Sequence, residues 1–106
     1  MLARAILINQ FEQADASIWA SQLGLLAYLN SKRQGENLPR LKELFFDRAA
    51  AQTPEWYQNY SFDAWLGFLQ RNNLVALNAG VASITDEGIE YLAWRVQQAR
   101  APKLHG

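Results

Sequence analysis

Apolar residues recur along most of this chain at the three- and four-residue spacing of an amphipathic helix. The spacing predicts three successive helices, at residues 17–30, 37–51 and 61–72. The last has the most regular apolar stripe, which consists of Phe62, Trp65, Leu66 and Leu69. Two polar residues, Asn37 and Ser61, stand where the second and third helices begin, and their side chains can cap a helix N-terminus. A further short helical turn is expected between these two helices.

Beyond residue 72 the spacing of apolar residues changes. Residues 74–77 and 81–85 are short β-prone runs that flank Asn78-Ala79-Gly80, and Asn and Gly favour tight turns. The two runs are therefore expected to pair as a β-hairpin. A fourth helix follows, capped by Thr85, with carboxylates in its first turn that the helix dipole stabilises. Its expected buried stripe consists of Ile89, Leu92, Ala93 and Val96.

The order of these elements, three helices, a hairpin and a helix, resembles that of a winged-helix domain. The residues that carry the resemblance run from Tyr60 to Trp94. Within them, the segment Ile84-Thr-Asp-Glu-Gly-Ile-Glu-Tyr-Leu92 is similar to the Leu/Ile-Thr-x-x-Gly-x-x-Tyr/Phe-Leu segment that often closes such domains. The resemblance implies a mainly α fold with a three-helix core, a two-stranded wing and a C-terminal helix. We expect this domain at residues 15–101, preceded by a helical segment, 1–14, that packs on it and followed by a frayed tail, 102–106.

Composition excludes several classes of protein. The 106 residues are 50% hydrophobic and 19% charged, which excludes a disordered or low-complexity chain and fits one domain. There is no Cys, and the only His is His105, so a disulfide framework and a thiolate metal site are excluded. The chain also lacks the sequence patterns of nucleotide-binding loops, zinc proteases and serine hydrolases. We therefore expect no catalytic, cofactor-binding or metal site, and no enzyme.

Charge is evenly distributed. Ten Lys and Arg balance ten Asp and Glu, and the balance holds in each third of the chain, which argues against a polybasic surface for nucleic acid or membrane. The apolar run at residues 5–8 is too short for a signal peptide, and the longest uncharged run, 16–31, is too polar to cross a bilayer. We expect a cytoplasmic protein; the alternative is that residues 2–8 are the trimmed edge of a longer parent protein.

Two aromatic residues of the fourth helix are the first candidates for a contact surface. Tyr91 and Trp94 lie opposite the expected buried stripe and are adjacent on the helix surface. Aromatic side chains on an exposed face are typical of protein interfaces. The alternative is that the N-terminal segment, residues 2–11, folds back and covers them.

The second candidate surface is the face of the third helix with Phe68 and Arg71, beside the small residues Ala64 and Gly67. Small residues let another backbone approach, whereas the alternative is a face that simply meets water or packs on the residues before Ser17. Together these observations favour a non-catalytic protein-interaction or regulatory module, whose partner is another protein or a second copy of the chain.

The resemblance also implies an alternative function, a transcriptional regulator that binds DNA. In DNA-binding winged-helix domains the third helix enters the major groove, which corresponds here to helix 61–72 with the wing at 74–85. The residues placed to contact DNA are Arg71, Gln70, Lys32 and Arg33. The third helix also carries Asp63 at its start, and the wing tip has no cation, so charge ranks this function second.

Overall fold

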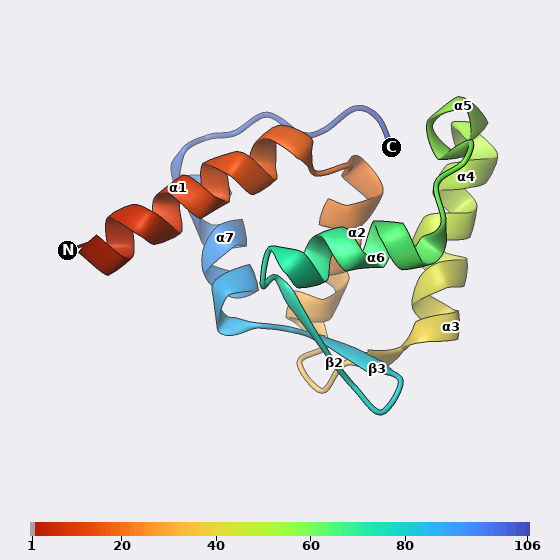
Figure 1. The fold of residues 1–106 in the computed structure, drawn as a ribbon, viewed down its shortest axis with the longest axis horizontal. Helices are drawn as coiled ribbons and strands as arrows, with labels where there is room; N and C mark the ends of the chain where they lie inside the picture. Colours follow the sequence, from red (N-terminus) through yellow and green to blue (C-terminus); the bar gives the residue numbers. More distant parts are fainter. Residues whose placement is uncertain (1) are drawn as a thin grey trace.

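The computed structural model describes residues 2–106, with side chains from residue 6 onward. The fold is mainly helical with a small antiparallel sheet, which confirms the expected fold class (Figure 1). In chain order the elements are α1 (Leu2–Ser17), α2 (Ala20–Ser31), β1 (Glu36–Asn37), α3 (Leu38–Leu41), η1 (Lys42–Asp47), α4 (Arg48–Gln52), α5 (Pro54–Tyr57), α6 (Phe62–Arg71), β2 (Val75–Asn78), β3 (Val81–Ile84) and α7 (Asp86–Gln97).

The helix predicted at residues 37–51 is one helical stretch with a wider turn in its middle. Asn37 caps its start, because its side chain accepts a hydrogen bond from the backbone N–H of Arg40 (2.9 Å). Segments α3 and α4 are α-helical, whereas η1 between them is a π-helix, whose hydrogen bonds span five residues. The wider turn rotates the side chains that follow. Phe46, which an unbroken α-helical spacing from Leu41 would place off the apolar stripe, is therefore buried.

The predicted hairpin is present, and a third strand joins it. β2 pairs antiparallel with β3, with Val75 opposite Ile84. The turn residues Ala79 and Gly80 both have positive φ (53° and 78°), as a type I′ hairpin turn requires. β1 pairs with the free edge of β3, which gives the strand order β1-β3-β2. The expected two-stranded wing is thus a three-stranded sheet, because folding brings the loop after α2 to the edge of the hairpin.

Glu36 anchors β1 to the end of α2. Its carboxylate accepts hydrogen bonds from the Lys32 ammonium (2.8 Å), the Tyr28 hydroxyl (2.7 Å) and the backbone N–H of Asn37 (3.1 Å). These bonds lower the pKa of Glu36 from 4.5 to about 2, and the bond from Lys32 has the largest effect. The third strand is therefore held by a charged side chain as well as by its pairing with β3.

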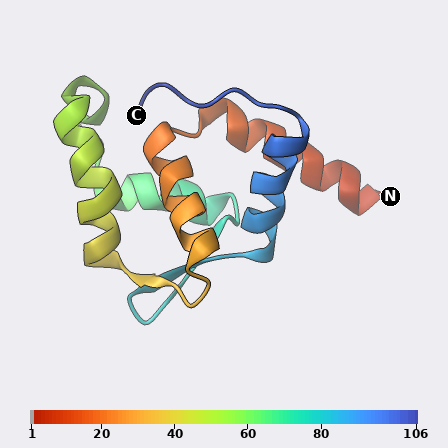
Figure 2. The same cartoon turned by 180° about the vertical axis from the view of Figure 1, so that it is seen from behind.

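The hydrophobic core surrounds α2, which contacts η1, α6, α7 and β3 (Figure 2). The fully buried apolar side chains of the core helices are Leu25, Leu26, Leu29, Leu41, Trp65, Leu69 and Tyr91. One polar side chain, Gln22, is buried among them. Its amide donates to the Trp65 carbonyl (2.9 Å) and accepts from the Trp19 backbone N–H (2.8 Å), so its polar atoms are paired.

Helix α7 buries a different face from the one that the sequence predicted. Tyr91 and Trp94, expected to face solvent, are only 0% and 7% exposed. Helix α1 covers them, and the Phe11 ring lies 5.5 Å from the Tyr91 ring and 5.7 Å from the Trp94 ring. In the expected buried stripe, by contrast, Val96 is 80% exposed. The expectation of an exposed Tyr91–Trp94 face was therefore wrong, whereas the alternative, that the N-terminal segment covers these two rings, is confirmed by Phe11.

Both ends of the chain pass over the outside of this core (Figure 1). The N-terminal half of α1 extends beyond the rest of the fold (Figure 2). Residues 102–106, expected to fray, run back to the start of α2, where the carbonyl oxygens of His105 and Gly106 accept hydrogen bonds from backbone N–H groups. In this structure the segment expected to fray is thus hydrogen-bonded to α2. Among the residues described here, no helix has the length and apolar character needed to span a membrane.

Candidate interaction surface on helices α1 and α7

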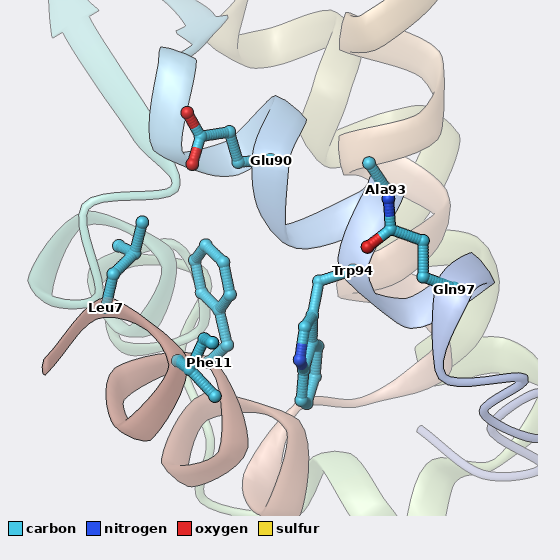
Figure 3. Close-up of a pocket in the computed structure, with 7 residues that line it drawn as sticks. Leu7, Phe11, Glu90, Ala93, Trp94 and Gln97 are labelled. Atoms are coloured by element: carbon cyan, nitrogen blue, oxygen red, sulfur yellow. The ribbon is translucent and has the colours of Figure 1, made fainter. Parts of the chain in front are cut away.

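A groove of about 160 Å³ lies between α1 and α7 (Figure 3). It is lined by Leu7, Ile8, Phe11, Glu90, Ala93, Trp94 and Gln97. The α1 residues Leu7 and Phe11 form one wall and Trp94 of α7 the other, as Figure 3 shows. Glu90 and Gln97 are two helical turns apart, so the polar groups lie towards the two ends and the middle is apolar. The groove can hold apolar side chains of another molecule.

Helix α7 is apolar on two faces, and the described chain covers one of them fully and the other only in part. The first face contains Tyr91 and Trp94 and is buried under α1. At 100° per residue, the second face contains the residues of the predicted stripe. Two of them, Ile89 and Leu92, are half-buried, whereas Ala93 and Val96 are exposed. Because Ala93 also lines the groove, the exposed side of α7 and the groove form one continuous surface.

Helix α1 extends this surface. Ile6, near the protruding end of α1, is 58% exposed. Together with Leu7 it borders a second hollow of about 420 Å³, whose other wall is the start of α7. That wall is acidic and consists of Asp86, Glu87 and Glu90. We call the groove, the outer side of α7 and this acidic rim the α1–α7 surface.

A buried carboxylate, Asp15, fixes α1 to α7. Its Oδ1 accepts hydrogen bonds from the Tyr91 hydroxyl and from Nε of Arg95, both at 2.6 Å. Burial alone would raise the pKa of Asp15, but the bonds from Tyr91 and Arg95 outweigh it and lower the pKa. For Tyr91, burial and the neighbouring carboxylate both raise the pKa. Asp15 and Arg95 carry no local signal of this role in the sequence, because only the folded chain brings them together.

Of the predicted contact residues on α7, Tyr91 is a core residue and Trp94 forms a wall of the groove. Tyr91 has no exposed surface, so it cannot contact another molecule while α1 is in place. Trp94 is 7% exposed and its ring also stacks under the Arg100 guanidinium (4.6 Å). The candidate surface on α7 therefore moves from these two rings to the side of the helix that carries Val96.

The predicted residues of α6 lie on a separate surface. Phe68 is half-buried against the core, whereas Gln70 and Arg71 are exposed. The Arg71 guanidinium folds back along the helix, with Nη1 3.2 Å from the place where a Cβ on Gly67 would stand. Arg71 thus covers Gly67, one of the two small residues of the predicted contact face, whereas the other, Ala64, is exposed.

The other two candidate DNA contacts, Lys32 and Arg33, lie at the end of α2 and have local partners. Lys32 is paired with Glu36, which raises the pKa of Lys32. Nε of Arg33 donates to the carbonyl oxygen of Asn30 (2.8 Å), one of the last carbonyls of α2. Lys32 therefore holds the carboxylate of β1, and Arg33 binds the end of α2.

Within residues 6–106 no three His, Asp or Glu side chains gather in a way that could hold a metal ion. Comparison of the chain with known protein families, curated proteins and solved structures finds no match. The resemblance to winged-helix domains therefore stays a prediction from the sequence.

Proposed function

We propose that this domain is a non-catalytic protein-interaction module, and that its contact surface is the α1–α7 surface. The observation that carries the proposal is the two-faced apolar character of α7. A helix that is apolar on most of its circumference is normally covered on most of it. Here Tyr91 and Trp94 are covered, whereas Val96 is 80% exposed, and its neighbour in sequence, Gln97, lines the groove.

The occupant that fits this surface best is a second copy of the chain. One chain supplies both an exposed apolar helix end, at α1, and an apolar groove beside it. In a two-fold pairing each copy can place the end of its α1 on the surface of the other, so both features are covered at once. In such a dimer the acidic rim of one copy meets the α1 end of the other. The charges are favourable, because residues 2–11 contain Arg4 and no carboxylate. The net charge of zero adds no overall repulsion between copies.

The test measures whether the chain dimerises and how much one charge introduced on the surface weakens the dimer. Sedimentation equilibrium should show dimers, and Val96→Glu should weaken their association at least about tenfold, equivalent to about 1.4 kcal/mol. Leu77→Glu is the matched control, because it places the same charge on a partly exposed apolar residue of the hairpin. Wild-type chain that stays monomeric up to about 1 mM contradicts the proposal, as does equal weakening by both variants.

A second function, a transcriptional regulator that binds DNA, is favoured by one observation. The outward residues of α6 are exposed, and so are the residues of the hairpin turn, which leaves a helix and a hairpin accessible together. Titration of a random-sequence DNA duplex at about 50 and 200 mM salt tests this function, because phosphate neutralisation makes affinity fall steeply with salt. Arg71→Ala should then weaken the binding. Absence of binding at about 100 μM protein, the weak end of typical non-specific affinities, excludes it.

A further inference from the structure

Helices α1 and α2 are joined by a sharp turn at two residues, Ile18 and Trp19. In Figure 2, α1 crosses the top of the fold and α2 runs down through it. The backbone of Trp19 is extended (φ −97°, ψ 160°), although helical hydrogen bonds are present on both sides of the turn. Residues 2–23 contain no Gly or Pro, so no residue in this stretch breaks a helix by itself. Contacts from other parts of the chain must therefore hold the turn.

The turn interrupts a series of backbone hydrogen bonds that a continuous helix would contain. In a continuous helix, the N–H groups of residues 19–21 would donate to the carbonyl oxygens of residues 15–17. In this structure the N–H of Trp19 donates instead to the side chain of Gln22 (2.8 Å). Gln22 belongs to α2 itself, so this bond replaces only one of those that the turn interrupts.

Residues 103–106 supply partners for freed backbone groups on both sides of the turn. On the α2 side, the carbonyl oxygens of His105 and Gly106 accept hydrogen bonds from the N–H groups of the first two helical residues (2.9 and 3.2 Å). On the α1 side, Nζ of Lys103 donates to the carbonyl oxygen of Asp15 (2.5 Å). Each of these three bonds uses a backbone group that a continuous helix would use itself. The C-terminal segment therefore stabilises the turned form against the straight one.

Straightening of the turn costs little in hydrogen bonds. The N–H groups of residues 19–21 would return to carbonyl oxygens four residues earlier, so bonds are exchanged rather than lost. The C-terminal segment has few buried contacts, since Leu104 is 84% exposed, and such segments open at low free-energy cost. What remains is the packing of α1 on the core. The described buried residues of α1 all lie in its second half and are Phe11, Ala14 and Asp15.

The face of α7 that α1 covers needs a cover in every state of the chain. It carries the buried rings of Tyr91 and Trp94. It also carries Arg95, whose Nε lies 2.6 Å from Oδ1 of the buried Asp15. Separation of a buried ion pair leaves an uncompensated charge and is strongly destabilising. The α1 of a second copy has the same Phe11 and Asp15, so it can restore all of these contacts.

We propose that Ile18 and Trp19 are a hinge, that residues 103–106 are a latch on this hinge, and that opened chains pair by exchanging α1. In the exchanged dimer, α1 and α2 form one helix over residues 2–31, about 45 Å long at about 1.5 Å per residue. Each α1 then packs on α7 of the other copy, in a reciprocal two-fold arrangement. Short connections between elements favour such exchange.

The exchange is independent of the proposed function. It reuses the buried contact between α1 and α7, and it needs neither Val96 nor the acidic rim. A dimer formed through the α1–α7 surface keeps each α1 on its own chain, whereas the exchanged dimer places it on the other chain. The two kinds of dimer therefore differ in a distance within one chain.

The test begins with refolding of the full chain from urea at about 1 mM, because high concentration favours pairing by mass action. The products are diluted to about 10 μM and separated by size-exclusion chromatography. Exchanged dimers should persist after dilution, because their separation requires each α1 to leave α7. A fraction of the wild-type chain should therefore elute as a dimer.

Spin labels on Gln13→Cys and Arg71→Cys show which chain α1 packs on, since the natural chain has no Cys. Both residues are exposed and line one hollow of about 230 Å³, so the labels lie close together while α1 packs on its own chain. Labelled chain is refolded with an excess of unlabelled chain, so that only distances within one chain are measured. Double electron–electron resonance should find this distance longer in the persistent dimer than in the monomer.

Two variants should shift the exchange in opposite directions. Gly106→Ala should release the latch, because the new Cβ would lie 2.5 Å from Cβ and Cγ of Trp19. Loss of two hydrogen bonds from the turned form should raise the ratio of exchanged dimer to monomer at least about tenfold. Ala20→Pro should block exchange, because proline suits the first residue of α2 and an extended residue before it, but not the interior of a straight helix. The ratio should then fall at least about a hundredfold.

The matched control is Leu104→Ala, which changes an exposed side chain of the latch and none of its three hydrogen bonds. This variant should exchange as wild type does. Absence of a persistent dimer in both wild type and Gly106→Ala overturns the proposal. A persistent dimer in which the label distance is that of the monomer also overturns it, as does an Ala20→Pro chain that exchanges as readily as wild type.

Discussion

Removal of one hydroxyl group should test how α1 is joined to the core. Tyr91 is 0% exposed, and its hydroxyl donates to Oδ1 of Asp15 at 2.6 Å. Tyr91→Phe removes that oxygen and leaves the ring in its contacts with Phe11 and Trp94. Asp15, itself 6% exposed, then keeps Arg95 as the remaining donor to Oδ1.

The size of the effect follows from the charge and burial of the acceptor. A hydrogen bond to a charged group contributes about 1.5 to 3 kcal/mol, and loss of one partner leaves the buried carboxylate less well satisfied. We therefore expect Tyr91→Phe to lower the free energy of unfolding by about 2 kcal/mol. For a domain that loses about 2 kcal/mol per molar urea, the unfolding midpoint should fall by about 1 M.

The assay is urea unfolding followed by tryptophan fluorescence, with a second Tyr→Phe variant as control. The Tyr60 hydroxyl lies 3.5 Å from its acceptor, the Ala64 carbonyl, which is too long for a strong bond. Tyr60→Phe should therefore change the free energy of unfolding by less than about 0.5 kcal/mol. An equal loss in both variants, or no loss in Tyr91→Phe, refutes the role assigned to the Asp15–Tyr91 bond.

The same variant makes a prediction about pH. The pKa of Asp15 is lowered in the folded protein, so its stabilising contribution is complete above its ordinary value of 3.8 and is lost as the pH falls through the folded value. The difference in stability between wild type and Tyr91→Phe should therefore be largest near neutral pH and shrink in acid. Unfolding curves measured from pH 7 down to below 3.8 check this sign.

Three further predictions concern stability. Gly88→Ala should destabilise the domain by more than about 1 kcal/mol, because the new Cβ would overlap the Leu74 carbonyl oxygen. Gly67→Ala, on the outer face of α6, should instead stabilise the domain by up to about 1 kcal/mol, because Ala favours a helix more than Gly does. Thermal unfolding of both variants distinguishes the two effects. Ala99→Gly should stabilise α7 by about 1 kcal/mol in urea unfolding, because Ala99 has a left-handed φ of 50° where the helix ends. Glu36→Gln should lower stability at neutral pH and flatten the acid loss of stability between pH 4.5 and about 2, where wild-type Glu36 becomes protonated; a wild-type-like acid profile contradicts this.

Local signals in the sequence predicted the helix starts and the hairpin. The side chains of Asn37, Ser61 and Thr85 accept hydrogen bonds from backbone N–H groups three residues later, as helix caps do. The apolar stripe of α6 was also predicted, since Trp65, Leu66 and Leu69 are buried. These features depend on interactions between residues that are close in the sequence, so the local sequence is enough to predict them.

Of the features that join distant segments, the packing of the N-terminal helix was expected, whereas the third strand and the place of the C-terminal segment were not. The third strand, β1, exists because β3 offers an unpaired edge to the loop after α2. The C-terminal segment is ordered because the start of α2 lacks a cap, and its two carbonyl oxygens fill that need. Nothing in the spacing of residues 102–106 indicates such a partner.

Helix α7 shows where the two kinds of information divide. The sequence by itself determined that residues 86–97 form a helix with Thr85 as its cap, because capping and helical spacing are local properties. Its apolar residues occupy most of its circumference, so local spacing could not decide which face is buried. Tertiary structure decided this, because Phe11 and Asp15 of α1 supply an aromatic ring and a carboxylate that match Tyr91, Trp94 and Arg95. Val96 was left on the outside because no described segment of the chain covers it.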